Sequence, residues 1–163
     1  MNNLTIKKLL GHLVTVVKHR HHVKWECYKR GMFWQGAMHD ISKFHPVEFI
    51  ASARYYTGYK SPIGLEKADN GYSMAWLHHK AANKHHWEYW TDFKEGKILR
   101  CPVPEKYVRE MACDMIGASK AYLGKKHCKT DPLEYFKKHE YRFLMNQEAK
   151  NLLEQLLKQY AEN

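Results

Sequence analysis

The chain has 163 residues, of which 44% are hydrophobic and 27% charged, and its formal net charge is +10. This length suits one domain with a core of its own, and the composition excludes a disordered chain. The apolar runs are too short to span a bilayer, and the N-terminal stretch lacks the pattern of a secretory signal. We therefore expect a cytoplasmic protein without a membrane partner.

The positive charge favours anionic partners, such as a phosphorylated small molecule, a nucleotide or a nucleic acid. The basic residues are spread along the chain and form no single tract, which weakens the nucleic-acid interpretation. The chain has four cysteines and no Cys-x-x-Cys pair, so we expect the thiols to be packing residues.

Apolar residues at helical spacing predict helices in chain order over residues 5–28, 33–40, 47–56, 72–89 and 105–123. One or two closing helices are expected over about 130–161. Proline and glycine predict loops over 57–71 and 91–104, and no alternating strand pattern stands out. The expectation is an all-α protein with a single domain over 1–163, whose metal-site core covers about 12–124.

Histidine is over-represented, with 12 in the chain, and several of them gather in two stretches, around residues 19–39 and 78–86. Clustered histidines are most often explained by metal ligation. The sharpest motif is His39-Asp40 followed by Lys43. An imidazole and a carboxylate at one point offer a nitrogen and an oxygen ligand, and Asp40 could bridge two ions. Lys43 would supply a cation for a substrate phosphate.

Three further elements are candidate ligands. His19 shares the apolar face of the first helix, where a packed core histidine is the main alternative. In the second histidine stretch, helical geometry would place His78 above His85 and His79 above His86, about 10 Å apart and too far to chelate one ion closely. Two alternatives there are a helix that ends between the histidines of each pair and a polar helix face. Asp114 lies among apolar helix positions, where burial is costly without a partner; Glu110 could support it, and an ordinary salt bridge is the alternative.

The order of these residues resembles the HD-domain metal-dependent phosphohydrolase superfamily. The positions that match are His19, His39-Asp40, His78 or His79, His85 or His86, and Asp114. The resemblance implies an HD-like helical bundle with a binuclear site, and iron oxygenases share that fold. The short spacing from His79 to His86 leaves open a single-ion site made of His19, His39, Asp40 and Asp114.

Three stretches, 39–49, 76–80 and 83–90, resemble more closely an uncharacterised family of bacterial and phage proteins, domain of unknown function 5662. The similarity covers about residues 19–124, and it implies no substrate.

We therefore expect a metal-dependent phosphohydrolase that acts on a nucleotide or another phosphoester. Its one or two ions would be Mn, Fe, Co, Ni or Zn, which suit mixed histidine and carboxylate ligands. The expected ligands are His19, His39, Asp40, His78, His79, His85, His86 and Asp114. Lys43, Asp40 and Arg109 are the expected catalytic residues. Two alternatives stay open: a di-iron oxygenase with the same ligands, and a nucleic-acid-binding or regulatory protein with a structural metal.

Overall fold

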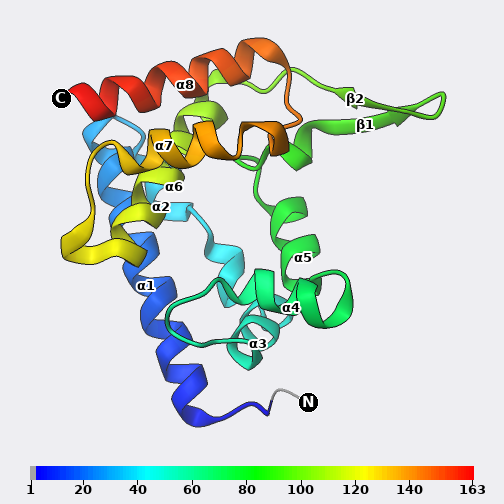
Figure 1. The fold of residues 1–163 in the computed structure, drawn as a ribbon, viewed down its shortest axis with the longest axis vertical. Helices are drawn as coiled ribbons and strands as arrows, with labels where there is room; N and C mark the ends of the chain where they lie inside the picture. The colour runs from blue at the N-terminus through cyan, green and yellow to red at the C-terminus, as the bar shows by residue number, and fades with distance from the viewer. Residues whose placement is uncertain (1–2) are drawn as a thin grey trace.

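The computed structural model describes residues 3–163, and helices make up most of it (Figure 1). This confirms the expected all-α class. The α-helices are α1 (Ile6–Lys29), α2 (Phe33–Met38), α3 (Pro46–Arg54), α4 (Pro62–Asn70), α5 (Met74–Ala82), α6 (Glu105–Leu123), α7 (Asp131–Lys138) and α8 (Gln147–Glu162). The short 3-10 helices are η1 (Ile41–Phe44), η2 (Trp87–Trp90), η3 (Gly124–Lys126) and η4 (Glu140–Arg142).

The long helices α1 and α6 pack against each other, and their contact fixes the centre of the molecule. Thr5 caps the start of α1, because its hydroxyl accepts a hydrogen bond from the Lys8 amide. Gly117 of α6 lies directly against Val23 of α1, and a Cβ atom at position 117 would stand 2.4 Å from Val23 Cγ2. This close approach brings the middle of both helices within reach of one another.

The chain turns back sharply between α1 and α3. Gly31 has a φ of +73°, which ends the turn after α1 without a steric penalty. The second predicted helix, over 33–40, stops two residues early, since His39 and Asp40 leave helical geometry. Asp40 has φ 53° and ψ 27°, in the left-handed region that a residue with a Cβ rarely adopts. Such strain is typical of functional sites.

Two loop predictions are wrong. The expected loop over 57–71 contains α4, which begins at Pro62 and ends before Gly71 with a φ of 80°. The expected loop over 91–104 contains an antiparallel hairpin of β1 (Thr91–Lys94) and β2 (Lys97–Arg100), in which Thr91 pairs with Arg100. The hairpin projects from the bundle as a thin arm (Figure 1). Both of its strands are four residues long and largely exposed, so no alternation marks them.

The largest apolar core lies where α7 and α8 pack against α6. Its centre consists of side chains without exposed surface, among them Val108, Ile116, Phe136, Leu153 and Leu157. The prediction of one or two closing helices over about 130–161 is confirmed, and the structure has two, α7 and α8. Among residues 3–163, no helix combines the length and the apolar character that crossing a bilayer requires.

Candidate metal centre

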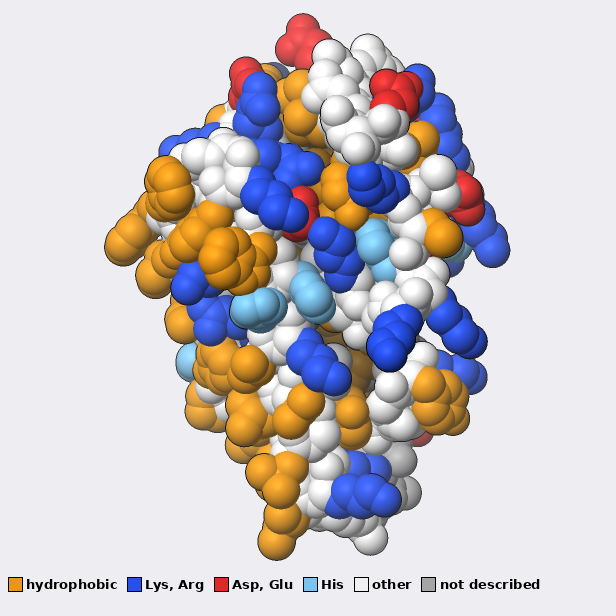
Figure 2. Space-filling view, turned by 90° about the vertical axis from the view of Figure 1, so that its left-hand side faces the viewer, with side chains coloured by type: hydrophobic (Ala, Val, Ile, Leu, Met, Phe, Trp, Pro, Cys, Tyr) orange, Lys and Arg blue, Asp and Glu red, His pale blue; other side chains and the backbone are white. Residues whose placement is uncertain are grey.

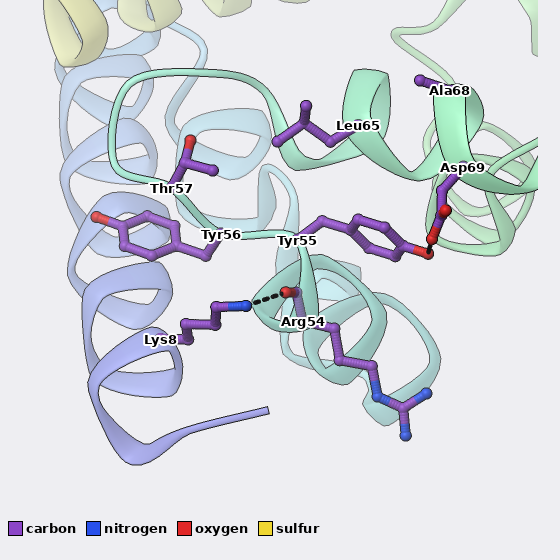
Figure 3. Close-up of a pocket in the computed structure, with 8 residues that line it drawn as sticks. All are labelled: Lys8, Arg54, Tyr55, Tyr56, Thr57, Leu65, Ala68 and Asp69. Carbon is purple, nitrogen blue, oxygen red and sulfur yellow. Dashed lines mark hydrogen bonds between the residues drawn. The ribbon is translucent and has the colours of Figure 1, made fainter. Parts of the chain in front are cut away.

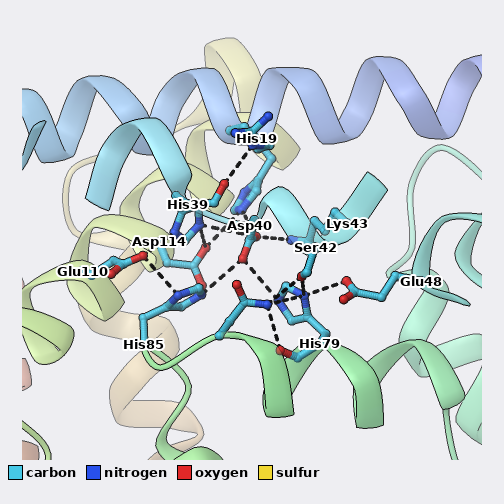
Figure 4. Close-up of polar contacts among 12 residues, drawn as sticks. His19, His39, Asp40, Ser42, Lys43, Glu48, His79, His85, Glu110 and Asp114 are labelled. Carbon is cyan, nitrogen blue, oxygen red and sulfur yellow. Dashed lines mark hydrogen bonds and ion pairs between the residues drawn. The ribbon is translucent and has the colours of Figure 1, made fainter. Parts of the chain in front are cut away.

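Segments far apart in the sequence bring histidines and carboxylates to one buried point (Figure 4). His19 comes from α1, His39 and Asp40 from the turn after α2, and Asp114 from α6. His79 comes from the end of α5, with His85 and His86 just beyond it. Two groups of four side chains could each hold a metal ion, with all ligand atoms of a group within 4.8 Å of one another: His19, His39, Asp40 and Asp114, and Asp40, His79, His85 and His86.

Asp40 belongs to both groups, and its two oxygens point to different sides. Oδ2 lies 3.1 Å from His19 Nε2 and 3.3 Å from His39 Nε2. Oδ1 lies 3.4 Å from His79 Nε2 and 3.3 Å from His85 Nε2. A carboxylate that offers one oxygen to each of two ligand sets has the geometry of a bridging ligand.

Asp114 completes the first group from the opposite helix. Its Oδ1 atom lies 3.2 Å from His19 Nε2 and 3.5 Å from His39 Nε2. The helix pair explains this meeting, because Val23 and Gly117 hold α1 and α6 in contact one turn away from His19 and Asp114.

The second group forms because α5 ends before His85 and His86, and this end is earlier than predicted. The expected helix over 72–89 stops at Ala82, and Asn83 takes an extended conformation with φ −118° and ψ 108°. The chain then folds back, so that the rings of His79 and His86 lie 4.7 Å apart between their centroids. The separation of about 10 Å that a continuous helix would give is therefore wrong, and the alternative of a helix that ends between these histidines is confirmed.

Several atoms in the centre are buried without a hydrogen-bond partner among residues 3–163. They are His39 Nε2, His85 Nε2, His86 Nε2 and Asp40 Oδ1. Buried polar atoms are costly when unpaired, and such orphans call for an explanation. All four belong to the candidate ligand groups. A cation in each group of four would satisfy these atoms, so the donor sets fit metal ions.

A second layer of carboxylates orients the imidazoles from behind. Glu110 Oε1 lies 3.0 Å from His39 Nδ1 and 3.2 Å from His85 Nδ1. Glu48 Oε2 lies 2.8 Å from His79 Nδ1. When each Nδ1–H donates to a carboxylate, Nε2 is the free lone pair that faces the centre, as in known histidine metal sites. His39, His85 and Glu110 could also form a ligand group of their own, but Glu110 meets the Nδ1 atoms, which makes it an orienting group.

Charge pairing sets the protonation of the centre. Burial would raise the pKa of Asp40, but the charges of His39 and Lys43 outweigh it and hold that pKa well below its usual range. Burial would also raise the pKa of Asp114, but the ion pairs with His19 and His39 hold that pKa well below its usual range. Both carboxylates are therefore ionised, as ligands must be.

The histidines divide into two types. Burial would lower the pKa of His39, but the charge of Asp40 and the nearby carboxylate of Asp114 hold that pKa well above its ordinary value. Burial and the neighbouring charges of His85 and His79 keep the pKa of His86 well below its ordinary value. His86 is therefore neutral and ready to ligate, whereas His39 must release a proton when an ion binds.

Lys43 lies beside the centre. Its Nζ atom stands 2.5 Å from Asp40 Oδ2, and its side chain is 25% exposed. Asp114, at 19%, is the most exposed of the three paired carboxylates Asp40, Asp114 and Glu110. Lys43 and Asp114 are therefore both partly accessible to solvent.

Two expected site residues are not brought to the centre. Arg109 pairs with Glu105 on the outer side of α6, with Nη2 2.6 Å from Oε1. His78 is partly exposed, and its Nδ1 atom lies 2.6 Å from Glu48 Oε1. His78 therefore contacts a carboxylate of the second layer and lies outside both groups of four.

The sequence did not single out Glu48 as a site residue. It led us to expect that Glu110 supports Asp114, whereas Glu110 contacts His39 and His85. Glu110 does stand on the buried face of α6, four residues before Asp114, and that spacing was a usable signal. Glu48 sits in the first turn of α3, where an acidic residue is ordinary. No feature of the sequence distinguishes it.

Two surface cavities lie away from this centre. One, of about 440 Å³, is lined by residues of α1, α4 and the end of α3, including Lys8, Tyr55 and Asp69 (Figure 3). Two of its polar groups have partners: Lys8 Nζ donates to the Arg54 carbonyl, and the Tyr55 hydroxyl donates to Asp69 Oδ2. The other, of about 480 Å³, surrounds Glu26 and Lys120. Neither cavity includes a candidate ligand.

Comparison with known proteins identifies the family of this chain, but it gives no activity for it. No curated protein and no solved structure matches the chain. The model of one protein family, described as a family of unknown function (DUF5662), matches residues 8–159, which is nearly the whole chain. The chain therefore belongs to the DUF5662 family.

Proposed function

We propose that this protein is a metal-dependent phosphohydrolase with two metal ions bridged by Asp40. The observation that carries the proposal is the arrangement of the Asp40 oxygens, with Oδ2 toward His19 and His39 and Oδ1 toward His79 and His85. Paired ions that share a carboxylate recur in enzymes that hydrolyse phosphate esters. The order of the ligands along the chain, which resembles that of the HD-domain superfamily, supports the same class.

The first ion would be held by His19, His39, Asp40 and Asp114, and the second by Asp40, His79, His85 and His86. Histidine nitrogen with carboxylate oxygen suits Mn, Fe, Co, Ni or Zn better than Mg or Ca. When bound, such an ion lowers the pKa of a water molecule and polarises a phosphoryl oxygen.

Side chains around the two ligand groups would orient the histidines and stabilise the charge on the substrate. Glu110 and Glu48 hold the imidazoles of His39, His85 and His79 in one orientation. Lys43, which is partly exposed, would place a positive charge beside the phosphoryl oxygens and stabilise the charge that develops there. The buried surroundings limit the access of bulk water, which strengthens each of these interactions.

The substrate would be a nucleotide or another phosphoester. The net charge of +10 favours an anion, and the Lys43 ammonium group lies 2.5 Å from the Asp40 carboxylate, where it could meet a phosphoryl group.

The test is a phosphoester screen. Wild type and Asp40→Asn are stripped of metal, reloaded separately with Mn, Fe, Co, Ni and Zn, and assayed with generic phosphomonoesters, phosphodiesters and nucleotides. We expect turnover by wild type with at least one metal and its loss in Asp40→Asn. Phosphate release that is equal in both proteins would reject the proposal.

Two other results would assign a different function. An iron-loaded protein that changes its absorbance on exposure to air, without hydrolysing any phosphoester, would indicate an oxygenase. Metal retention with salt-dependent nucleic-acid binding and no turnover would indicate a binding protein with a structural metal.

A further inference from the structure

The outward face of α1 and the adjoining α2 carries apolar side chains that no other element within residues 3–163 covers. On α1 they recur at helical spacing and end near Trp25, which is 52% exposed. On α2, Phe33 is 64% exposed and Trp34 is 73% exposed. We define the apolar strip by its most exposed members: Ile6, Leu10, Val14, Val17, Trp25, Phe33, Trp34 and Met38.

Aromatic contacts join the two helices into one surface. The rings of Trp25 and Tyr28 lie 6.1 Å apart, and those of Tyr28 and Phe33 lie 5.3 Å apart. The strip therefore continues from the first turn of α1 to the end of α2. Exposed apolar patches of such extent usually mark an interaction site.

The charge beside the strip is of one sign. Lys7, Lys18 and Lys24 are exposed on α1, and Arg20 is partly exposed. Between residues 3 and 39 the only acidic residue is Glu26, which is buried and paired with Lys120. Figure 2 shows hydrophobic side chains with Lys and Arg among them along the lower part of this face, while acidic side chains gather in its upper part.

We propose that the apolar strip docks on the surface of an anionic lipid bilayer. A helix with exposed Trp, Phe and aliphatic side chains, flanked by Lys and Arg, is typical of interfacial membrane binding. The apolar side chains would enter the boundary between headgroups and acyl chains, and the lysines would meet the anionic headgroups.

The composition of the strip favours lipid over two other occupants. Half of its defining members are aliphatic, namely Ile6, Leu10, Val14 and Val17, and aliphatic side chains do not stack on nucleobases. A second copy of the chain would bring the same lysines against one another. The expectation of no membrane partner rested on the length of the apolar runs, and a helix that lies in the interface needs no long run.

This proposal is independent of the metal centre, because His12, Val16, His19 and Val23 occupy the opposite, buried face of α1. Binding would place the turn that carries His39 and Asp40 near the membrane, since α2 leads directly into it.

The test uses the full chain and vesicles of phosphatidylcholine with or without phosphatidylserine. We expect co-sedimentation with the anionic vesicles only, weakening with salt, and a blue shift of tryptophan emission on binding. The double variant Phe33→Ser/Trp34→Ser should lose at least about tenfold in partitioning. Phe93→Ser, which removes a 69% exposed side chain from the hairpin, is the matched control and should bind normally.

A second pair of variants tests the charge. Lys18→Ser/Lys24→Ser should lower partitioning about tenfold, whereas Lys94→Ser/Lys97→Ser, on the hairpin, should not. Absence of vesicle binding would overturn the proposal. So would binding that Phe33→Ser/Trp34→Ser leaves intact, a dimer in solution that this variant dissociates, or tight binding of nucleic acid without vesicle binding.

Discussion

Glu110 Oε1 lies 3.0 Å from Nδ1 of His39, a residue 71 positions earlier in the chain. The same oxygen lies 3.2 Å from His85 Nδ1. One carboxylate thus orients one histidine from each ligand group, although it belongs to neither group of four.

Glu110→Gln should weaken metal binding without removing a ligand. The amide can present its nitrogen where the carboxylate oxygen stood, and it carries no charge, so both imidazoles lose their fixed orientation. We expect metal affinity about 10- to 100-fold lower, measured by competition with a chromogenic chelator. Glu105→Gln, on the exposed side of the same helix, is the control; an equal loss in both variants would remove the orienting role.

Substitution of Lys43 should lower phosphoester hydrolysis strongly, whereas substitution of Arg109 should leave it nearly unchanged. Lys43→Met keeps the length of the side chain and removes the charge beside Asp40, so we expect kcat/KM for a phosphoester about 100-fold lower. Arg109→Ala should change it by less than about twofold, because Arg109 pairs with Glu105 on the outer side of α6. Metal content is measured in parallel, and a loss of turnover in Arg109→Ala at full metal content would contradict this assignment.

The contact between Gly117 and Val23 should be intolerant of a methyl group. In Gly117→Ala the new Cβ would meet Val23 Cγ2 at 2.4 Å and the Val23 amide nitrogen at 2.9 Å. Separating α1 from α6 should cost about 1–3 kcal/mol in the free energy of unfolding, measured with urea. Gly64→Ala has open space and should be neutral or more stable by at most about 1 kcal/mol; a neutral Gly117→Ala would show that the helices can shift.

Glu26 should stabilise the fold in a defined pH range. Burial would raise the pKa of Glu26, but its hydrogen bonds with Lys120 and Arg30 lower it from 4.5 to about 2. Because the folded pKa lies below the unfolded one, the stabilisation is present above pH 4.5 and is lost as the pH falls toward 2.

Wild type and Glu26→Gln, both stripped of metal, should therefore differ by about 1–3 kcal/mol in the free energy of unfolding at neutral pH. The difference should shrink below pH 4.5 and vanish near pH 2. A difference that is constant over this range would exclude the charge of Glu26 as its source.

The sequence predicted the long helices well, because their apolar residues recur over many turns. Residues 105–123 coincide with α6, and 5–28 differs from α1 by one residue at each end. The short elements escaped prediction. Pro62 and Gly71 suggested a loop, yet they are the start and the end signals of α4. The exposed strands of the hairpin carry no burial pattern to detect.

The ligand types were predictable from clustering, but their convergence was not. The identity of the second group depends on where α5 ends, and Asn83 gave only a weak indication of that end. Glu48 became visible only when tertiary contact placed it behind His79. A side chain that acts through another leaves no local pattern in a sequence.

The most direct test of the centre is the number of metal ions per chain, measured by elemental analysis after loading and desalting. We predict about two ions in wild type, about one in Asp114→Asn and in His86→Ala, and close to none in Asp40→Asn, because Asp40 alone belongs to both groups of four. Wild type that retains no Mn, Fe, Co, Ni or Zn, or Asp40→Asn that retains two ions, would contradict a bridged pair of metal ions.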